Sequence, residues 1–327
     1  MADHHGKMNY SIAQRFGFLA FNVLLAILMI LVNKAVFTRL HFNFPIALTT
    51  VHYTFTWLGL ELLRRIGVYR QIPASKMPLT QFDIASCILL AVVGVPLNNL
   101  SLRLNGVGTY QLLKLLVTPG ICILNYILLK DLISLKRSLI LVLVCIGIAI
   151  ATFNDLELRL YGLVVALIFV PVAAVYKVQF KRVLKDYDML SLLHRVYPPA
   201  IFIMCILSLL LDPPGLFTTY KFTFGKIAQI CSTGILACGI SISSFHIVDV
   251  FSPLTHQILG LLKVSLTILG GWLFFSNTIT MYQMLGSVIA LMGISWYTYE
   301  TMLEKGMMNE NGGKDKSIGL RSVYSKV

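Results

Sequence analysis

The sequence predicts an all-α polytopic membrane protein with ten transmembrane helices, arranged as two inverted five-helix repeats, and with both termini in the cytosol. Two features of composition support the membrane assignment: hydrophobic residues make up 57% of the 327 residues, and charged residues only 13%. Runs of about 20 almost uncharged residues also recur along the chain, and one helix needs about that length to cross a bilayer. The distribution of lysine and arginine supports the orientation.

Apolar windows bounded by charges and turn residues define the ten helices, which we expect at 14–37, 45–64, 82–103, 106–129, 137–153, 160–181, 189–211, 226–248, 252–275 and 279–300. The first five form one repeat over 14–153 and the last five a second repeat over 160–300. Residues 1–13 precede the first helix as a cytosolic segment. Residues 305–327 are polar and rich in glycine, so we expect a disordered cytosolic tail.

Basic residues are distributed unequally between the two ends of the predicted helices. With both termini cytosolic, 17 lysines and arginines lie on the cytosolic side and five on the other, namely Arg39, Arg103, Arg159, Lys221 and Lys226. Cytosolic loops of membrane proteins carry such an excess. Most of the net charge of +13 therefore reflects topology. We expect the lipid bilayer as the surroundings and no nucleic-acid partner.

The cysteines give no sign of a metal site, because all six lie in apolar spans without the spacing of zinc ligands: Cys87, Cys122, Cys145, Cys205, Cys231 and Cys238. We expect no metal and no cofactor. An enzyme acting on lipid-linked phosphates would need deep carboxylates or histidines, and here three histidines lie in spans without a deep Asp or Glu. We therefore expect a protein that is not an enzyme.

Five basic residues lie inside predicted spans. Lys34, Lys177 and Arg195 are within about two turns of a helix end, where a long side chain can reach the headgroups. Lys114 and Lys263 lie roughly 12 to 17 Å deep, at a rise of about 1.5 Å per residue, in a hydrocarbon core of about 30 Å. A buried cation is tolerated when it faces an aqueous cavity that an anion enters. The alternative is a lysine held by backbone carbonyls and hydroxyls.

The two deep lysines belong to similar segments. GTYQLLKLLVTPG begins at Gly108 and SPLTHQILGLLKVSLT at Ser252, and each lies in the fourth helix of its half. With an odd number of spans in each half, the halves have inverted topology, and transporters built in this way bind substrate near the midplane between the repeats. The deep positive charge predicts an anion, and the lack of deep carboxylates argues against a proton-coupled pump.

Longer segments around these lysines resemble a known family. NNLSLRLNGVGTYQLLKLLVTP from Asn98 and SSFHIVDVFSPLTHQILGLLKVSLTILGGWLFF from Ser243 are similar to the triose-phosphate and nucleotide-sugar translocators of the drug/metabolite transporter superfamily, and most similar to the UDP-sugar transporters of the Golgi. VNKAVF, LTTVHYTFTW and the closing pattern of Gly286, Gly293 and Tyr297 add to the resemblance.

The resemblance implies an antiporter that imports a nucleotide sugar into the secretory lumen in exchange for the nucleoside monophosphate, by alternating access. It implies a multi-pass protein of the Golgi or endoplasmic reticulum membrane, in which Lys114 and Lys263 contact the substrate phosphates. A same-fold alternative is a plastid-type antiporter of triose phosphate or another phosphorylated metabolite. The family pattern varies here at His256, Leu261 and Val264, which leaves the base and the sugar open.

Ten further polar residues are candidates for contacts to the base or the sugar: Tyr110, Gln111, Thr255, His256, Gln257, Asn33, Lys34, Asn99, His52 and Ser244. Hydrogen bonds between helices are the alternative role for these residues. Gly286, Ala290 and Gly293 form a small-residue face on the last span, which predicts packing against another helix or a homodimer contact with a second copy.

Overall fold

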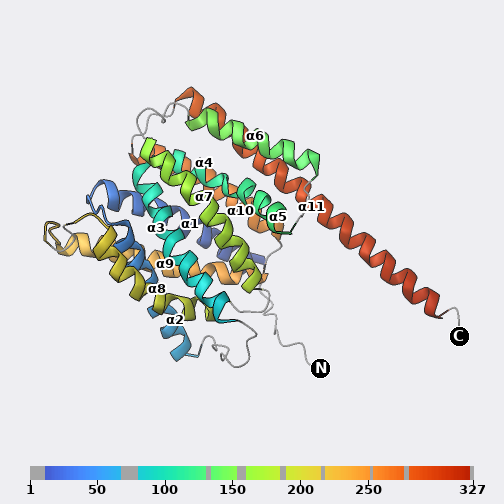
Figure 1. Cartoon of the computed structure of the whole chain (residues 1–327), viewed down its shortest axis with the longest axis horizontal. Coiled ribbons are helices and arrows are strands. Elements are labelled where there is room, and N and C mark those ends of the chain that lie inside the picture. Colours follow the sequence, from blue (N-terminus) through green and yellow to red (C-terminus); the bar gives the residue numbers. More distant parts are fainter. Residues whose placement is uncertain are drawn as a thin grey trace.

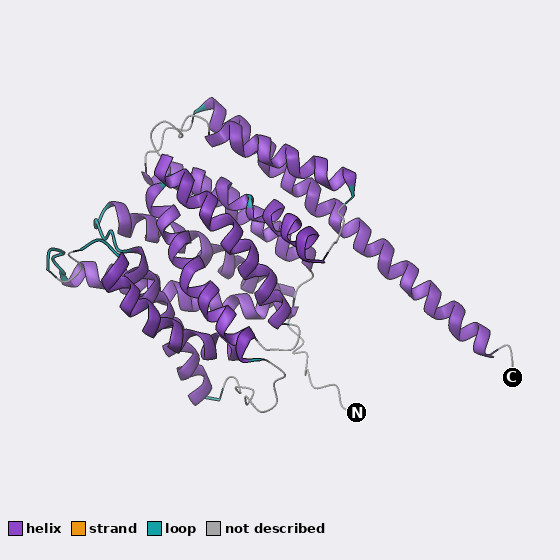
Figure 2. Ribbon diagram, viewed as in Figure 1, coloured by secondary structure: helices purple, strands orange, loops and turns teal. Residues whose placement is uncertain are grey.

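The structure is a computed structural model that describes residues 12–67, 80–129, 134–152, 160–184, 189–214, 218–250, 253–275 and 280–324. Across these ranges the regular structure is all helical (Figure 2). The helices are α1 (Ile12–Thr38), α2 (Pro45–Arg65), α3 (Gln81–Leu104), α4 (Val107–Leu115), α5 (Val117–Leu129), α6 (Leu135–Thr152), α7 (Leu160–Val183), α8 (Met189–Leu211), α9 (Phe224–Val250), α10 (Pro253–Phe275) and α11 (Met281–Tyr324).

These helices follow the predicted segments with two differences. The segment expected at 106–129 is divided into α4 and α5 at Leu116. Pro119 explains the division, because its ring clashes with the carbonyl four residues earlier, that of Leu115, and it has no N–H to donate. The N–H of Leu116 instead bonds to the carbonyl of Leu113 at 3.1 Å, a tighter turn at the end of α4.

The second difference concerns the C-terminal end. Composition predicts disorder over 305–327, whereas α11 continues as helix to Tyr324 and projects away from the bundle (Figure 1). A helix satisfies its backbone hydrogen bonds internally, so the chain can extend α11 without a packing partner. The division of the chain into two repeats and two terminal segments stays a prediction.

The helices have the length and the surface of a membrane protein. Seven helical segments in the described ranges are long and apolar enough to cross a bilayer: Leu19–Thr38, Gln81–Leu104, Val107–Ile127, Leu135–Thr152, Leu160–Phe180, Met189–Leu211 and Phe224–Ser244. Large apolar side chains cover the outside, among them Phe224, which is 89% exposed, and Leu135, which is 77% exposed. So large an apolar surface suits lipid rather than water.

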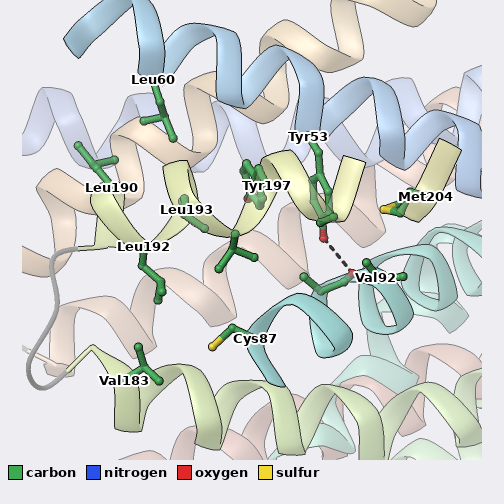
Figure 3. Packing of buried hydrophobic residues seen from close by; sticks show 13 residues of the cluster. Tyr53, Leu60, Cys87, Val92, Val183, Leu190, Leu192, Leu193, Tyr197 and Met204 are labelled. Atoms are coloured by element: carbon green, nitrogen blue, oxygen red, sulfur yellow. Dashed lines mark hydrogen bonds between the residues drawn. The ribbon is translucent and has the colours of Figure 1, made fainter. Parts of the chain in front are cut away.

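One hydrophobic core joins α2, α3 and α8 (Figure 3). The rings of Tyr53 on α2 and Tyr197 on α8 stack with their centroids 4.4 Å apart. The hydroxyl of Tyr53 donates to the carbonyl of Ala91 on α3 at 3.0 Å, drawn as a dashed line in the figure. Leu60 and Met204 are fully buried in the same cluster. The two predicted halves of the chain therefore share one core.

The small-residue face of α11 packs against α6 of the same chain. A Cβ on Gly147 of α6 would lie 2.6 Å from the backbone nitrogen of Ala290 and 2.9 Å from the carbonyl of Gly286. A Cβ on Gly293 would lie 2.8 Å from Val144. Glycine is required here because only its lack of a side chain allows the two backbones to approach. Of the two roles that the sequence left open for this face, the structure shows contact with another helix.

Carboxylates lie at helix ends, as their sequence positions indicate. Glu61 near the end of α2 binds Arg64 and Arg65 and accepts a contact from His194 of α8 at 3.1 Å. Asp83 at the start of α3 forms a capping box with Thr80 and an ion pair with Arg182 of α7 at 3.1 Å. These groups tie the helices together at one end of the bundle.

Candidate substrate-binding site

Lys114 and Lys263 lie on two helices that pack directly against each other, α4 and α10 (Figure 1). A Cβ on Gly108 would lie 3.8 Å from Ile268, and a Cβ on Gly271 would lie 2.7 Å from Val107. The start of α4 thus packs on the later part of α10. Lys114 comes six residues after Gly108 on α4, and Lys263 comes five residues before Ile268 on α10. The two lysines are therefore at similar heights, and their charges repel each other.

Lys114 is held by neutral polar groups. Its ammonium donates to the hydroxyl of Tyr110 at 3.3 Å and lies 5.4 Å from the centroid of the same ring. The Tyr110 hydroxyl uses its own proton to donate to Oδ1 of Asn98 on α3, at 2.8 Å. This leaves the hydroxyl oxygen as an acceptor for the lysine. The chain of contacts orients Lys114 without neutralising it.

Lys263 is also oriented by neutral polar groups, which come from α1 and α9. Its ammonium donates to Oδ1 of Asn22 on α1. The amide nitrogen of Asn22 donates to Oγ of Ser243 at 2.7 Å and to Oγ of Ser244 at 3.2 Å, both on α9. Asn22 is 1% exposed, so its orientation is fixed by these partners. Its carbonyl end faces the lysine because its amide end faces the serines.

The positive charge of the pair is not compensated by any described carboxylate. Across the ranges that the structure describes, the ion pairs of the acidic groups involve Arg64, Arg65, Lys136, Arg182 and His194. Neutral oxygens can orient an ammonium but do not cancel its field. Two cations in a low-dielectric setting are stabilised by an anion, so the arrangement suits a ligand with two negative charges.

Six of the ten other residues predicted for the site lie on α4, α9 or α10. Tyr110 and Gln111 lie one turn before Lys114 on α4 and are 2% and 3% exposed. Ser244 contacts Asn22 and so supports Lys263 from α9. For Thr255, His256 and Gln257 the structure places the backbone on α10, and their side chains lie outside what it describes.

Three predicted residues form contacts between helices. Lys34 donates to the carbonyls of Leu102, Arg103 and Asn105 at 2.9, 3.1 and 2.5 Å. Those carbonyls lack helical partners because α3 ends there, so Lys34 caps the end of α3.

The two remaining hydrogen-bonded pairs join α2 to its neighbours. His52 lies 3.0 Å from the Thr233 hydroxyl of α9, and Asn99 donates to Thr49 at 2.8 Å. Asn33 is 3% exposed, and in the described part of the chain its Oδ1 has no hydrogen-bond partner. Their role in binding stays a prediction.

Three residues that were not among those predicted for the site support the two lysines: Asn22, Asn98 and Ser243. Asn22 is an amide in the otherwise apolar run FLAFNVLLAIL, and this isolation is the one signal that could have identified it. Its partner on α10 is 241 residues away, a contact that only the fold reveals.

An apolar pocket lies elsewhere, between α5 and α6. It encloses about 670 Å³ and is lined by residues such as Ile123, Tyr126 and Val142. Its lining contains no lysine or arginine, and neither Lys114 nor Lys263 reaches it. It therefore does not offer the charge that a phosphate needs.

Several known proteins are similar to this chain over most of its length. "Nucleotide-sugar uncharacterized transporter 2" of Arabidopsis thaliana is 32% identical over 284 residues, which cover 86% of this chain and 71% of the relative. "UDP-xylose transporter 2" of the same organism is 30% identical over 304 residues, 89% of this chain and 84% of the relative. "UDP-rhamnose/UDP-galactose transporter 1" of the same organism is 29% identical, and the match covers 88% of this chain and 83% of the relative.

The fold and the family match over nearly the whole chain. One solved crystal structure matches this chain with a TM-score of 0.57 at 13% sequence identity. The match covers 88% of this chain and 98% of the solved chain, which shows a shared fold. The chain is a multi-pass membrane protein, and its relatives are transporters. The model of the Triose-phosphate Transporter family matches residues 16–298, which include both lysines, and the chain therefore belongs to that family.

Proposed function

We propose that the chain is an antiporter that imports a UDP-sugar into the lumen of the Golgi or endoplasmic reticulum and exports the nucleoside monophosphate. One observation carries the proposal: Lys114 and Lys263 lie at similar heights on the packed helices α4 and α10, and their hydrogen-bond partners among the described residues are neutral. The names of the relatives support nucleotide sugars as the substrate class, and UDP-sugars within it.

The two lysines suit a diphosphate. A lysine ammonium is a compact charge with three rotatable donors, so it can keep one bond to Tyr110 or Asn22 and direct others at phosphate oxygens. A hydrogen bond to a charged group contributes about 1.5 to 3 kcal/mol. Neutral supports also allow release, because the ligand leaves behind an oriented lysine and breaks no ion pair within the protein.

Recognition of the base and sugar falls to residues close to the two lysines along their helices. Tyr110 and Gln111 precede Lys114 by one turn, and Thr255, His256 and Gln257 precede Lys263 by about two turns on α10. In this proposal the phosphates bind between the lysines, and the base and sugar extend toward these polar groups.

The packing of the helices supports a ten-span topology with inverted halves, and the excess of lysine and arginine on one side supports cytosolic termini. If α4 and α5 form one span, exchanging the two halves maps α1 onto α7, α2 onto α8, α3 onto α9, α4–α5 onto α10 and α6 onto α11. The pair α3–α7 then corresponds to α1–α9, and α1–α10 to α5–α7. The pairs α2–α8, α4–α10 and α6–α11 each map onto themselves. Both lysines thus lie on one of the three helix pairs at the axis that relates the two halves.

Contacts between the halves at both ends of the bundle suit alternating access. At one end, Glu61 meets His194 and Asp83 meets Arg182. At the other end, Asp212 accepts from the backbone N–H of Ala47 at 2.8 Å. Opening toward one side of the membrane requires the contacts at that end of the bundle to break while the contacts at the other end remain. The lysines lie between them.

Counterflow in proteoliposomes tests the proposal. The full chain is reconstituted into vesicles loaded with UMP, and uptake of labelled UDP-xylose, UDP-galactose and UDP-glucose is measured against empty vesicles. We expect uptake of at least one UDP-sugar that depends on internal UMP. If only triose phosphate exchanges for phosphate, the proposal is wrong and the plastid-type alternative is supported.

A further inference from the structure

A layer of buried polar side chains crosses the bundle near the end at which α2 begins. The ring of His52 on α2 lies 3.0 Å from the hydroxyl of Thr233 on α9. Asn99 of α3 donates to the hydroxyl of Thr49 on α2 at 2.8 Å. Asn33 of α1 is the fifth member, and none of the five is more than 4% exposed. We refer to these five residues as the polar layer.

An apolar cluster next to the layer fixes the height of Asn33. Val36 of α1, Leu48 of α2 and Ile230 of α9 belong to one cluster of buried residues. Asn33 comes three residues before Val36, and Thr233 comes three residues after Ile230. Since α9 runs antiparallel to α1, both steps lead away from the cluster in the same direction. Asn33 and Thr233 therefore lie at similar heights.

The end of α3 gives the same height for Asn33. The ammonium of Lys34, the next residue along α1, donates to the carbonyl of Leu102 at 2.9 Å. Asn99 lies three residues before Leu102, which is less than one turn of α3. Asn33 is thus close in height to Asn99, and contacts with two different helices place it in the polar layer.

Asn33 also lies on the inward face of α1. The lipid-facing side of α1 includes Phe21, Leu24 and Leu28, which are 51%, 54% and 37% exposed. At about 100° per residue, Asn33 points away from these three side chains and only about 20° from the direction of Asn22. Asn22 is the residue that orients a lysine of the candidate site. The face of α1 that carries Asn33 is therefore the face that borders that site.

The polar layer contains an acceptor without a donor. Among the described residues, Oδ1 of Asn33 has no hydrogen-bond partner, although Asn33 is only 3% exposed. A buried acceptor without a donor costs free energy, and lipid supplies no water to provide one. An unsatisfied group of this kind is explained when a ligand brings the donor.

The layer is close enough to the two lysines to share a ligand with them. Asn33 is eleven residues, or about 16 Å, along α1 from Asn22, which binds Lys263. The lysine side chain and a sugar attached to the diphosphate can together span this separation. The layer is closed in this structure, but α1, α2 and α3 belong to the first predicted half and α9 to the second. Movement of the halves in alternating access is the step that admits the sugar.

The chemistry of the layer suits hydroxyl groups. It consists of two amides, two hydroxyls and an imidazole, without a charged lysine, arginine or carboxylate. A sugar hydroxyl can both donate and accept, so it can donate to Oδ1 of Asn33. We propose that the polar layer is the subsite for the sugar of the nucleotide sugar, and that Asn33 accepts a hydrogen bond from a sugar hydroxyl. The inference rests on the proposed function and adds the place at which the sugar binds.

Ligands with and without a sugar test this subsite. The affinity of the purified full chain is measured for UDP-xylose, UDP-galactose and UDP-glucose, and for UDP, which keeps the base, the ribose and both phosphates. Asn33→Leu replaces the amide by an apolar group of similar size, and Asn33→Ala removes it without adding bulk. The control is Asn125→Leu, the same change on α5 and outside the layer.

We expect Asn33→Leu and Asn33→Ala to weaken binding of the UDP-sugars by about tenfold, which corresponds to about 1.4 kcal/mol. Their affinity for UDP should stay as in the unaltered protein, and Asn125→Leu should change neither affinity. Asn33→Leu removes an unsatisfied acceptor, so its melting temperature without ligand should equal or exceed that of the unaltered protein.

Contrary results are assigned separately to the two proposals. An equal loss for UDP and the UDP-sugars would place Asn33 at the nucleotide, and unchanged affinities would remove it from the site. A lower melting temperature of Asn33→Leu would show that the amide is structural. Each of these results refutes the inference and leaves the proposed function standing. If the unaltered protein binds neither UDP nor a UDP-sugar, the proposed function fails, and the inference fails with it.

Discussion

Lys263 of α10 donates a hydrogen bond to Asn22 of α1, and Asn22 donates in turn to Ser243 and Ser244 of α9. A cation of the second half is thus oriented by an amide of the first half, and that amide by two hydroxyls of the second. Any movement that separates α1 from α10 must change the direction of this lysine. The contact therefore couples the charge of the site to the arrangement of the halves.

Replacing Asn22 by aspartate tests whether the site needs a neutral partner for Lys263. A carboxylate at this position would pair with the lysine and compete with the phosphates of the substrate. We expect nucleotide-dependent uptake to fall by about tenfold or more, which corresponds to the loss of roughly 1.4 kcal/mol of binding. Proteoliposome uptake measures the effect.

The matched control is Asn22→Gln, which keeps a neutral amide. It should retain more uptake than Asn22→Asp even though it is the larger change in shape. Equal activity of Asn22→Asp and the unaltered protein would contradict the requirement for uncompensated charge.

Lys34 should behave differently from the two site lysines. Because its ammonium binds three backbone carbonyls at the end of α3, Lys34→Met leaves buried acceptors without a donor. Each such acceptor costs about 1 to 3 kcal/mol. We expect a lower melting temperature without ligand, measured by thermal unfolding in detergent. An unchanged melting temperature together with lost nucleotide binding would instead assign Lys34 to the substrate.

The close contact of α6 and α11 should be intolerant of side chains. Gly147→Ala places a methyl group 2.6 Å from the backbone nitrogen of Ala290, where only a separation of the helices relieves the clash. Overpacking of this kind costs typically about 1 to 3 kcal/mol. Thermal unfolding should show the loss of stability.

Gly225→Ala is the control for this contact, because a Cβ there meets nothing within 4 Å and alanine favours helix. It should leave stability unchanged or slightly raised. Equal melting temperatures for Gly147→Ala and Gly225→Ala would mean that α6 and α11 are not held this closely.

The ion pair between Asp83 and Arg182 should contribute only modestly to the stability of the folded protein. Asp83→Asn removes the charge that accepts from Thr80 and Arg182 at the start of α3. Arg182 is 66% exposed, so solvent screens much of the attraction, and we expect a loss of about 1 kcal/mol or less. High salt should reduce the difference between variant and unaltered protein in thermal unfolding, and a difference that grows with salt would contradict the assignment.

The positions of helices were largely predictable, because apolar runs of span length are bounded by charges and turn residues. The division of α4 from α5 was predictable in principle from Pro119, since proline disrupts the helix four residues earlier. The small-residue spacing of Gly286, Ala290 and Gly293 indicated a packing surface but not its partner. Only the structure identifies that partner as α6.

The two lysines of the candidate site were predictable from the sequence, but the residues that orient them were not. Lys114 and Lys263 stand out because a lysine is costly in an apolar span. Asn22 and Asn98 do not, since single amides in spans also serve helix packing. Lys34 shows the reverse case: the sequence offered it as a candidate contact to the base or the sugar, whereas its ammonium binds the backbone carbonyls at the end of α3.

The most direct test of the two-lysine site is the shift in melting temperature that nucleotide ligands produce in Lys114→Ala and Lys263→Ala. A ligand that binds only the folded protein raises its apparent stability. UMP and a UDP-sugar should stabilise the unaltered protein, and each variant should lose that shift while unfolding at a similar temperature without ligand. An undiminished shift in both variants would contradict the central claim that these lysines hold the phosphates.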